Sequence, residues 1–254
     1  MERGTYISAS GGMNQLRKLD VVNNNLANVN TPGFKKELLV GSVHTFDQTL
    51  ASMVASKDPY AKGDHERTPG AVHAHSVTDF SLGPIKDTGN ELDLALRNPK
   101  DFFVINTPSG PRYTRAGNFT LNSEGQISTL DGMQVAGDGG AITITGAPLA
   151  ISPNGSVTSK GILVGKLQVV HFDDPKVLER EGSSRFTLPA GKPPPVPVEP
   201  DVIPRSLEMS NVSAITSMID LIAASKGFEM YTKTAQTIDG MNQSAIGQVG
   251  RRPS

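Results

Sequence analysis

Hydrophobic residues recur with a helical period at both ends of the chain and with short, irregular spacing in the middle. In the first segment, residues 5–30, they are spaced by three, four and three positions, which is the seam of a paired helix. The residues of this seam are Leu19, Val22, Leu26 and Val29. We expect the helix to end near residues 28–30, because Pro32 disfavours helical geometry at the residue before it.

The last segment, residues 207–246, repeats this spacing at Val212, Ile215, Ile219 and Ile222. Ser210 or Asn211 can cap the start of this second helix. In the first helix, Gly11 and Gly12 leave room for a neighbouring helix to approach closely. We therefore predict that the two terminal helices pair as a coiled coil.

Between the helices, residues 91–188 are divided into short strand-like runs by turn signals such as Asp131-Gly132 and Asn154-Gly155. Many short strands at this spacing are typical of an antiparallel sandwich or a distorted barrel. The predicted fold class is therefore α+β, with paired N- and C-terminal helices and a central antiparallel β-rich module.

Two connecting segments lack a strong period. Residues 38–90 form an extended connector, in which we expect a short helix over 44–56 and an irregular loop over 58–77. Residues 189–206 are too rich in Pro for a central strand and are expected to form a stiff, extended return linker. The other parts are a terminal helical domain, formed by residues 1–37 and 207–246, and a tail over residues 247–254.

The composition of the 254 residues narrows the classes of function. Only 37% are hydrophobic and Trp is absent, so we expect some apolar surface to be buried against other copies. The formal net charge of −1 provides no basic field for nucleic acid, and the absence of Cys excludes disulfides and thiolate metal sites. No run approaches the ~20 apolar residues of a membrane span. The N-terminus lacks the apolar core of a cleaved signal peptide.

Residues typical of catalysis do not form a recognisable motif. No phosphate-binding loop follows a predicted strand, and no nucleophile elbow is present. Asp173 and Asp174 precede a Pro, which is typical of a turn. His73 and His75 lie near other potential metal ligands, but no motif fixes the spacing, and we interpret them as solvated loop residues. We predict no catalytic residue, metal or cofactor.

Residues 24–35 read NNLANVNTPGFK, which resembles the N-terminal signature of the bacterial flagellar rod and hook proteins. Residues 207–212 read LEMSNV and resemble the segment that leads into the C-terminal helix of this family. The resemblance covers nearly the whole chain except residues 40–75 and the last eight. Further similar runs, of which the first and last look most like proximal-rod members, are residues 1–6, 90–95, 113–119 and 165–175.

The resemblance implies a structural subunit and not an enzyme. Such proteins are exported unfolded through the flagellar type III apparatus, without a cleaved signal. They assemble beneath a cap into a hollow rod that crosses the periplasm and transmits torque. The implied partners are other rod and hook proteins, copies of this chain, the export apparatus and the rod cap. Nucleic acid and membrane insertion are not implied.

Two sets of residues are the candidates for assembly. The residues expected to pair the helices are Leu19, Val22, Leu26, Val29, Val212, Ile215, Ile219 and Ile222. The residues expected to contact other subunits are Asn25, Asn28, Asn30 and Phe34, although a cluster of Asn is also typical of a solvated helix end.

Three alternatives stay open at this point. The chain could be a distal-rod subunit, which differs chiefly after the N-terminal signature. It could be a β-module enzyme with helical oligomerisation arms, which would need a pocket with convergent titratable groups. It could also be a periplasmic binding module that recruits a partner through the Pro-rich segment.

Overall fold

The computed structural model describes residues 2–45 and 69–249. The chain folds into two compact units. Unit 1 comprises residues 1–26, 37–77 and 214–254, and unit 2 comprises residues 27–36 and 78–213. The chain therefore passes between the two units after residues 26, 36, 77 and 213.

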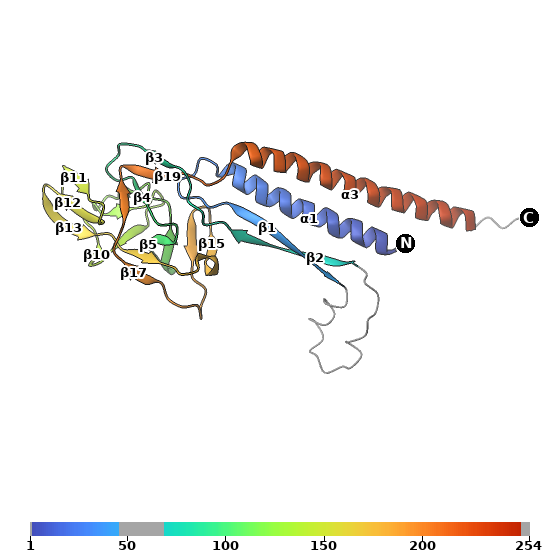
Figure 1. Cartoon of the computed structure of the whole chain (residues 1–254), viewed down its shortest axis with the longest axis horizontal. Coiled ribbons are helices and arrows are strands. Elements are labelled where there is room, and N and C mark those ends of the chain that lie inside the picture. The colour runs from blue at the N-terminus through green and yellow to red at the C-terminus, as the bar shows by residue number, and fades with distance from the viewer. Residues whose placement is uncertain (1, 46–68, 250–254) are drawn as a thin grey trace, which may run out of the picture. The chain divides into compact units, whose positions relative to one another are not determined.

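Unit 1 contains two long helices, α1 (Glu2–Ala27) and α3 (Ala214–Val249), which run side by side (Figure 1). The prediction of a helix at each end of the chain is confirmed. Within the described residues, no helix combines the length and the apolar composition that a membrane span requires.

The ends of both helices differ from the prediction by a few residues. α1 stops before the turn that leads to Pro32, and α3 begins after Asn211, whose side chain bonds to other segments of the chain. As a result, Val29 and Val212 lie outside the helices whose seams they were expected to extend.

A two-stranded sheet, formed by β1 (Glu37–Thr45) and β2 (Pro69–Thr78), accounts for the rest of the described part of unit 1 (Figure 1). The helix expected over residues 44–56 is wrong at its start, because residue 44 lies in β1. The loop expected over residues 58–77 is wrong from residue 69 onward. Residues 72–75 alternate apolar and polar, which favours a strand once a partner is available. The remainder of both segments lies outside the described residues.

Unit 2 is built on a ten-stranded sheet centred on β5 (Asp101–Thr107). One side of β5 pairs with β6 (Gly110–Thr114), and the other pairs with β9 (Gln134–Gly137) and β14 (Val169–His171), all antiparallel. The predicted antiparallel β-rich body is confirmed. The other strands of this sheet are β7 (Thr120–Leu121), β8 (Ile127–Ser128), β10 (Gly140–Ala141), β15 (Glu179–Glu181), β16 (Arg185–Thr187) and β17 (Val196–Val198).

Smaller sheets and one short 3-10 helix complete the described part of unit 2. A three-stranded sheet consists of β11 (Leu149–Ile151), β12 (Ser156–Ser159) and β13 (Ile162–Lys166). Two-stranded sheets join β4 (Leu94–Leu96) to β18 (Val202–Pro204), and β3 (Ile85–Asp87) to β19 (Ser206–Glu208). The 3-10 helix η2 (Pro175–Val177) precedes β15.

Strand β5 is buried on both faces, because successive side chains point to opposite sides of a strand. Phe103 and Ile105 belong to one hydrophobic cluster, and Phe102 and Val104 belong to a second. In the second cluster, Phe102 makes edge-to-face contacts with neighbouring Phe rings, including Phe172 at 5.5 Å between centroids. The chain therefore fills its core with Phe in the absence of Trp.

The Pro-rich segment, expected to be only an extended return linker, takes part in the sheets. Val196–Val198 pairs with β14 as strand β17, and Val202–Pro204 pairs with β4 as strand β18. Each has a single partner strand in the described structure, so each is an edge strand. Pro is tolerated at an edge because no ladder hydrogen bond is lost on the outer side.

Gly117 tests the packing of unit 2. A Cβ atom added at this position would lie 1.7 Å from the carbonyl oxygen of Leu94. We expect Gly117→Ala to lower the free energy of unfolding by about 1–3 kcal/mol, measured by urea unfolding. Gly139→Ala is the matched control, because its Cβ would meet no atom within 4 Å. Equal stability of the two variants would contradict this packing.

Candidate assembly site

The two helices of unit 1 approach each other through small residues. A Cβ atom added to Gly11 would lie 2.3 Å from the ring of Tyr231, and one added to Gly227 would lie 3.0 Å from the side chain of Gln15. The close approach expected near Gly11 is therefore present, with an aromatic ring as the facing group. The coiled-coil geometry stays a prediction.

The residues of the two predicted seams have different environments. In α1, Val22 is buried, and Leu19 and Leu26 are half-buried. In α3, by contrast, Ile215, Ile219 and Ile222 are 74%, 61% and 54% exposed. The three Ile side chains of the predicted α3 seam are thus largely exposed in the single chain. Outside the helices, Val29 is half-buried and Val212 is buried.

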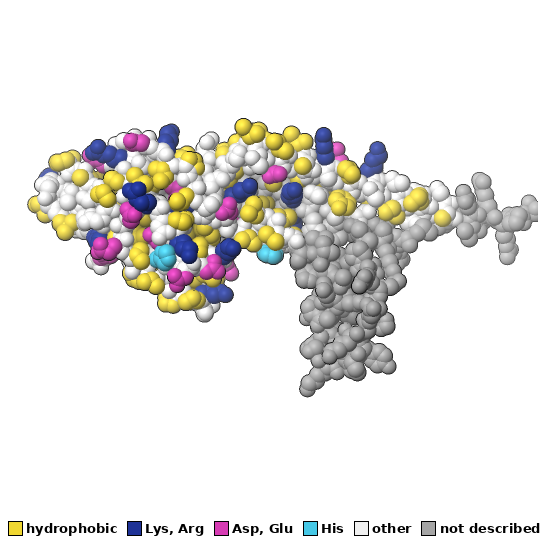
Figure 2. Space-filling view, in the orientation of Figure 1, with side chains coloured by type: hydrophobic (Ala, Val, Ile, Leu, Met, Phe, Trp, Pro, Cys, Tyr) yellow, Lys and Arg dark blue, Asp and Glu magenta, His cyan; other side chains and the backbone are white. Residues whose placement is uncertain are grey.

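The exposed residues of α3 form a continuous apolar surface. Ile215, Met218, Ile219 and Ile222 stand at positions i, i+3, i+4 and i+7, which share one face of a helix. We call these four residues the α3 stripe. Hydrophobic side chains gather over the beginning of α3 in Figure 2. Contiguous exposed apolar side chains of this kind are typical of protein interaction surfaces.

The four residues expected to contact other subunits are placed differently. The amide of Asn25 is buried, donates to the carbonyl oxygen of Glu37 at 2.8 Å and accepts from its N–H at 2.8 Å. Asn25 thus pairs with the first residue of β1 as a strand residue would. Phe34 is fully buried within the chain. Asn28 is half-buried and accepts from Thr31, whereas Asn30 is exposed.

Unit 2 contains a buried cluster of charged side chains that no motif in the sequence predicts. Lys35, Arg115 and Glu208 each have 1% or less of their surface exposed. One carboxylate oxygen of Glu208 accepts from Lys35 Nζ at 2.6 Å and from Gly83 N–H at 3.0 Å. The other accepts from Arg115 Nε at 2.9 Å and Nη2 at 2.6 Å. We call this group the charge cluster.

Arg115 has partners on every side. Besides Glu208, its guanidinium donates to the carbonyl oxygens of Asn98 and Asp101 at 2.6 Å and of Leu96 at 3.1 Å. A guanidinium has five N–H groups and stays protonated in proteins. The charge cluster therefore holds a permanent cation whose only described carboxylate partner is Glu208.

Asn211 and Arg180 extend this site. The Asn211 side chain accepts from the Lys36 N–H at 2.7 Å and donates to the Asp79 carbonyl oxygen at 2.9 Å. The Arg180 guanidinium lies 4.6 Å from the Phe34 ring centroid and donates to the Lys35 carbonyl oxygen. Lys35 Nζ also donates to the Ser81 carbonyl oxygen at 2.6 Å. Segment 33–36 is therefore bonded by three distant parts of the chain, around residue 81, around residue 180 and at residues 208–211.

Gly33 is required where this segment turns. Its φ of +68° lies in the left-handed region. A Cβ atom added there would lie 2.2 Å from the backbone nitrogen of Ala116. The Gly33 N–H donates to the carbonyl oxygen of Glu208 at 2.7 Å. This close approach places Lys35 within reach of the charge cluster.

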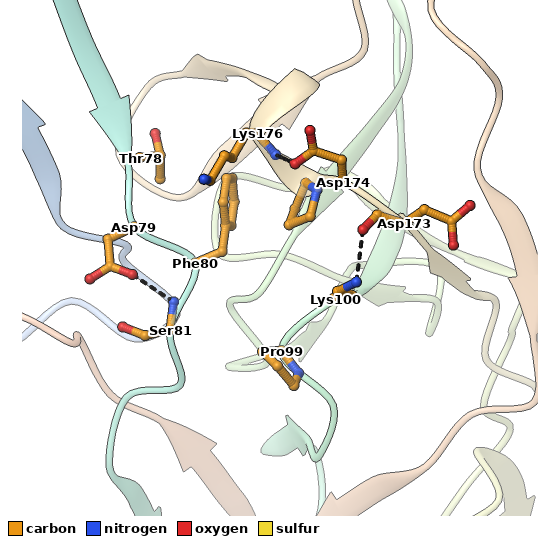
Figure 3. A pocket seen from close by; sticks show the side chains of 10 residues that line it. Thr78, Asp79, Phe80, Ser81, Pro99, Lys100, Asp173, Asp174 and Lys176 are labelled. Atoms are coloured by element: carbon orange, nitrogen blue, oxygen red, sulfur yellow. Dashed lines mark hydrogen bonds between the residues drawn. The ribbon is translucent and has the colours of Figure 1, made fainter. Parts of the chain in front are cut away.

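A pocket of about 420 Å³ lies in unit 2 between η2 and the segment that follows β2 (Figure 3). Its carboxylates serve local turns. Asp79 accepts from the Ser81 N–H at 3.0 Å, and Asp174 accepts from the Lys176 N–H at 3.1 Å. Lys100 donates to the Asp173 carbonyl oxygen at 2.8 Å. Three of the titratable side chains in this lining, Asp79, Lys100 and Asp174, are therefore bonded to nearby backbone atoms.

Among the described residues, no group of three or more His, Asp or Glu side chains is arranged to hold a metal ion.

The sequence matches flagellar families along most of its length. Residues 6–35 match the family described as flagella basal body rod protein, residues 98–159 match the flagellar hook protein FlgE/F/G D1 domain, and residues 204–248 match the flagellar basal body rod FlgEFG protein C-terminal family. The flagellar basal-body rod protein FlgF of Caulobacter vibrioides is 30% identical over 254 residues, 99% of each chain. The chain belongs to the flagellar basal-body rod protein family.

Other relatives carry two different names within the rod family. FlgF of Rhizobium meliloti is 30% identical over 98% of this chain and 99% of its own. FlgG of Bacillus subtilis is 31% identical over 97% of this chain and 98% of its own. Each of the three rod-family regions contributes one member of the charge cluster, namely Lys35, Arg115 and Glu208.

Titration of Lys35 tests the charge cluster. Burial is the main effect and lowers the pKa of its ammonium below the ordinary 10.5. The carboxylate of Glu208 raises this pKa, and the cation of Arg115 lowers it further. Between this lowered pKa and 10.5 the unfolded chain binds more protons, so the free energy of unfolding should rise with pH there. Below the lowered pKa the contribution of Lys35 is constant and unfavourable.

We expect Lys35→Met to remove this rise. Urea unfolding of the natural chain and of the variant, from neutral pH to 10.5, gives the difference between their free energies of unfolding. This difference should shift in favour of the natural chain as the pH rises. Replacing the exposed Lys86 by Met is the control and should leave the pH dependence unchanged. Parallel curves for Lys35→Met and the natural chain would contradict the lowered pKa.

Proposed function

We propose that this protein is a structural subunit of the flagellar basal-body rod that polymerises through its terminal helices. The α3 stripe is the observation that carries the proposal. Its four residues are apolar and more than half exposed in the single chain. Membership of the rod family supplies the context in which a neighbouring subunit would cover them.

The energetics of the α3 stripe support assembly. Fully burying one large aliphatic side chain contributes roughly 1.5–3 kcal/mol. The four residues of the stripe can therefore stabilise a subunit contact substantially, after the entropy lost on association is subtracted. Most of the stability of a helix in a protein comes from packing of its apolar face. Assembly would then stabilise α1 and α3 as well as join the subunits.

Charged residues farther along α3 limit the length of the apolar subunit contact. Farther along α3, the positions that continue the face of the stripe are occupied by Lys226, Glu229 and Lys233, all exposed. Burying unpaired charges is unfavourable. The apolar contact should therefore be confined to the first turns of α3.

The assembled rod would be a hollow shaft in the periplasm, reached by export without a cleaved signal. It would transmit torque and let exported subunits pass. Its partners would be other rod and hook proteins, further copies of this chain, the export apparatus and the rod cap. The terminal helices would pair in a coiled coil and line the tube.

Within the rod we place this chain at the proximal position, as an FlgF-like subunit. Residues 1–6 and 165–175 support this position through their resemblance to proximal-rod proteins. A distal, FlgG-like position is the second candidate, because a Bacillus subtilis FlgG is equally similar. Locating the chain along the axis of purified basal bodies distinguishes the two.

The α3 stripe gives the direct test. We expect Ile219→Asp to abolish motility and to remove the chain from purified basal bodies, because the carboxylate would be desolvated in the subunit contact. Unfolding of the purified single chain should be unchanged, because Ile219 is 61% exposed there.

Ile162→Asp is the matched control, because Ile162 is 70% exposed but lies in β13, away from the helices in sequence. It should assemble normally. Normal motility in Ile219→Asp, or equal loss in both variants, would overturn a contact through the stripe.

A further inference from the structure

The charge cluster joins two segments that lie far apart in the sequence. We call residues 31–36 the N-segment and residues 206–211 the C-segment. The Gly33 N–H donates to the Glu208 carbonyl oxygen at 2.7 Å, and Lys35 Nζ donates to the Glu208 carboxylate at 2.6 Å. A third bond runs from the Lys36 N–H to Asn211 at 2.7 Å.

These two segments stand next to the terminal helices in sequence. α1 ends at Ala27, shortly before the N-segment, and α3 begins at Ala214, shortly after the C-segment. Any process that orders both segments together therefore fixes the chain just after the end of α1 and just before the start of α3.

The charges of the cluster are not equivalent. Glu208 is the only carboxylate that bonds the cations of Lys35 and Arg115 among the described contacts. Without Lys35, the remaining Arg115–Glu208 pair is balanced and keeps its two hydrogen bonds. Without Glu208, Arg115 stays protonated and buried with carbonyl oxygens alone. Removing one partner of a buried ion pair is strongly destabilising for this reason.

In the folded chain, water has no access to the donors that bond the Glu208 carboxylate. Glu208 is 1% exposed, and all four of its side-chain hydrogen bonds come from groups of unit 2: Lys35, Gly83 and two nitrogens of Arg115. If the C-segment left, the N-segment would lose Glu208 and Asn211 at the same time and would keep its bonds to Ser81, Asp79 and Arg180.

We infer that Glu208 is a latch, which makes docking of the N-segment conditional on docking of the C-segment. The two ends of the chain then become ordered on unit 2 in one step rather than independently. This inference does not rest on the proposed function, since it concerns the single chain.

Hydrogen exchange of the full chain tests the latch. The reporters are the N–H groups of Gly33 and Lys36 in the N-segment and of Met209 in the C-segment, which donates to the Pro84 carbonyl oxygen at 2.9 Å. We expect all three to exchange through one opening, with the same denaturant dependence and protection within about twofold. Opening of the N-segment while Met209 stays protected would overturn the latch.

If the three reporters exchange only by global unfolding, two variants test the latch instead. Glu208→Gln should accelerate exchange at all three reporters by on the order of 100-fold or more, because Arg115 is left without a counter-charge. Lys35→Met should accelerate it by less than about tenfold, because a balanced pair remains. A Glu208→Gln chain that fails to fold while Lys35→Met folds supports the same asymmetry.

Glu181→Gln is the matched control, because Glu181 also pairs with an arginine, Arg112, but is 43% exposed. It should leave the three reporters unchanged, and Glu208→Asp, which keeps the charge, should be milder than Glu208→Gln. An effect of Lys35→Met equal to or larger than that of Glu208→Gln would overturn the latch.

Discussion

The buried carboxylate of Glu208 is the interaction on which the arrangement of unit 2 depends. It brings together a lysine that follows α1, an arginine from the β-rich body and the strand that precedes α3. Burying three ionised groups is unfavourable unless every hydrogen bond is made. Here the carboxylate and the guanidinium are fully bonded, so the charges specify one arrangement of distant segments where apolar contacts would allow several.

The two units solve different physical problems. Unit 2 buries β5 on both faces and packs two hydrophobic clusters, so it has the core of an independent domain. Among the described residues of unit 1, by contrast, large apolar side chains of α3 stay exposed, and the helices meet at Gly11 and Tyr231. One unit is thus complete in the single chain, whereas the surface of the other is suited to association.

Local patterns were sufficient to predict the helices, the antiparallel body and the family. They failed where a partner distant in sequence decides the outcome. Residues 69–77 were expected to be a loop because nothing in their vicinity shows the pairing with β1. The faces of α3 could not be assigned from spacing, since Ile219 and Ala224 fit different helical stripes and only the second is buried. The pairing of Lys35 with Glu208 spans 173 positions, and no sequence spacing encodes it.

The Pro-rich strand β17 has a consequence for how copies of this protein can meet. A sheet with an open edge can extend from one molecule to the next and form aggregates. At the edge formed by β17, Pro197 opposes Val170 and has no N–H to offer to an incoming strand. Growth by strand addition is therefore obstructed at this edge, so contacts between copies are directed to other surfaces of the chain.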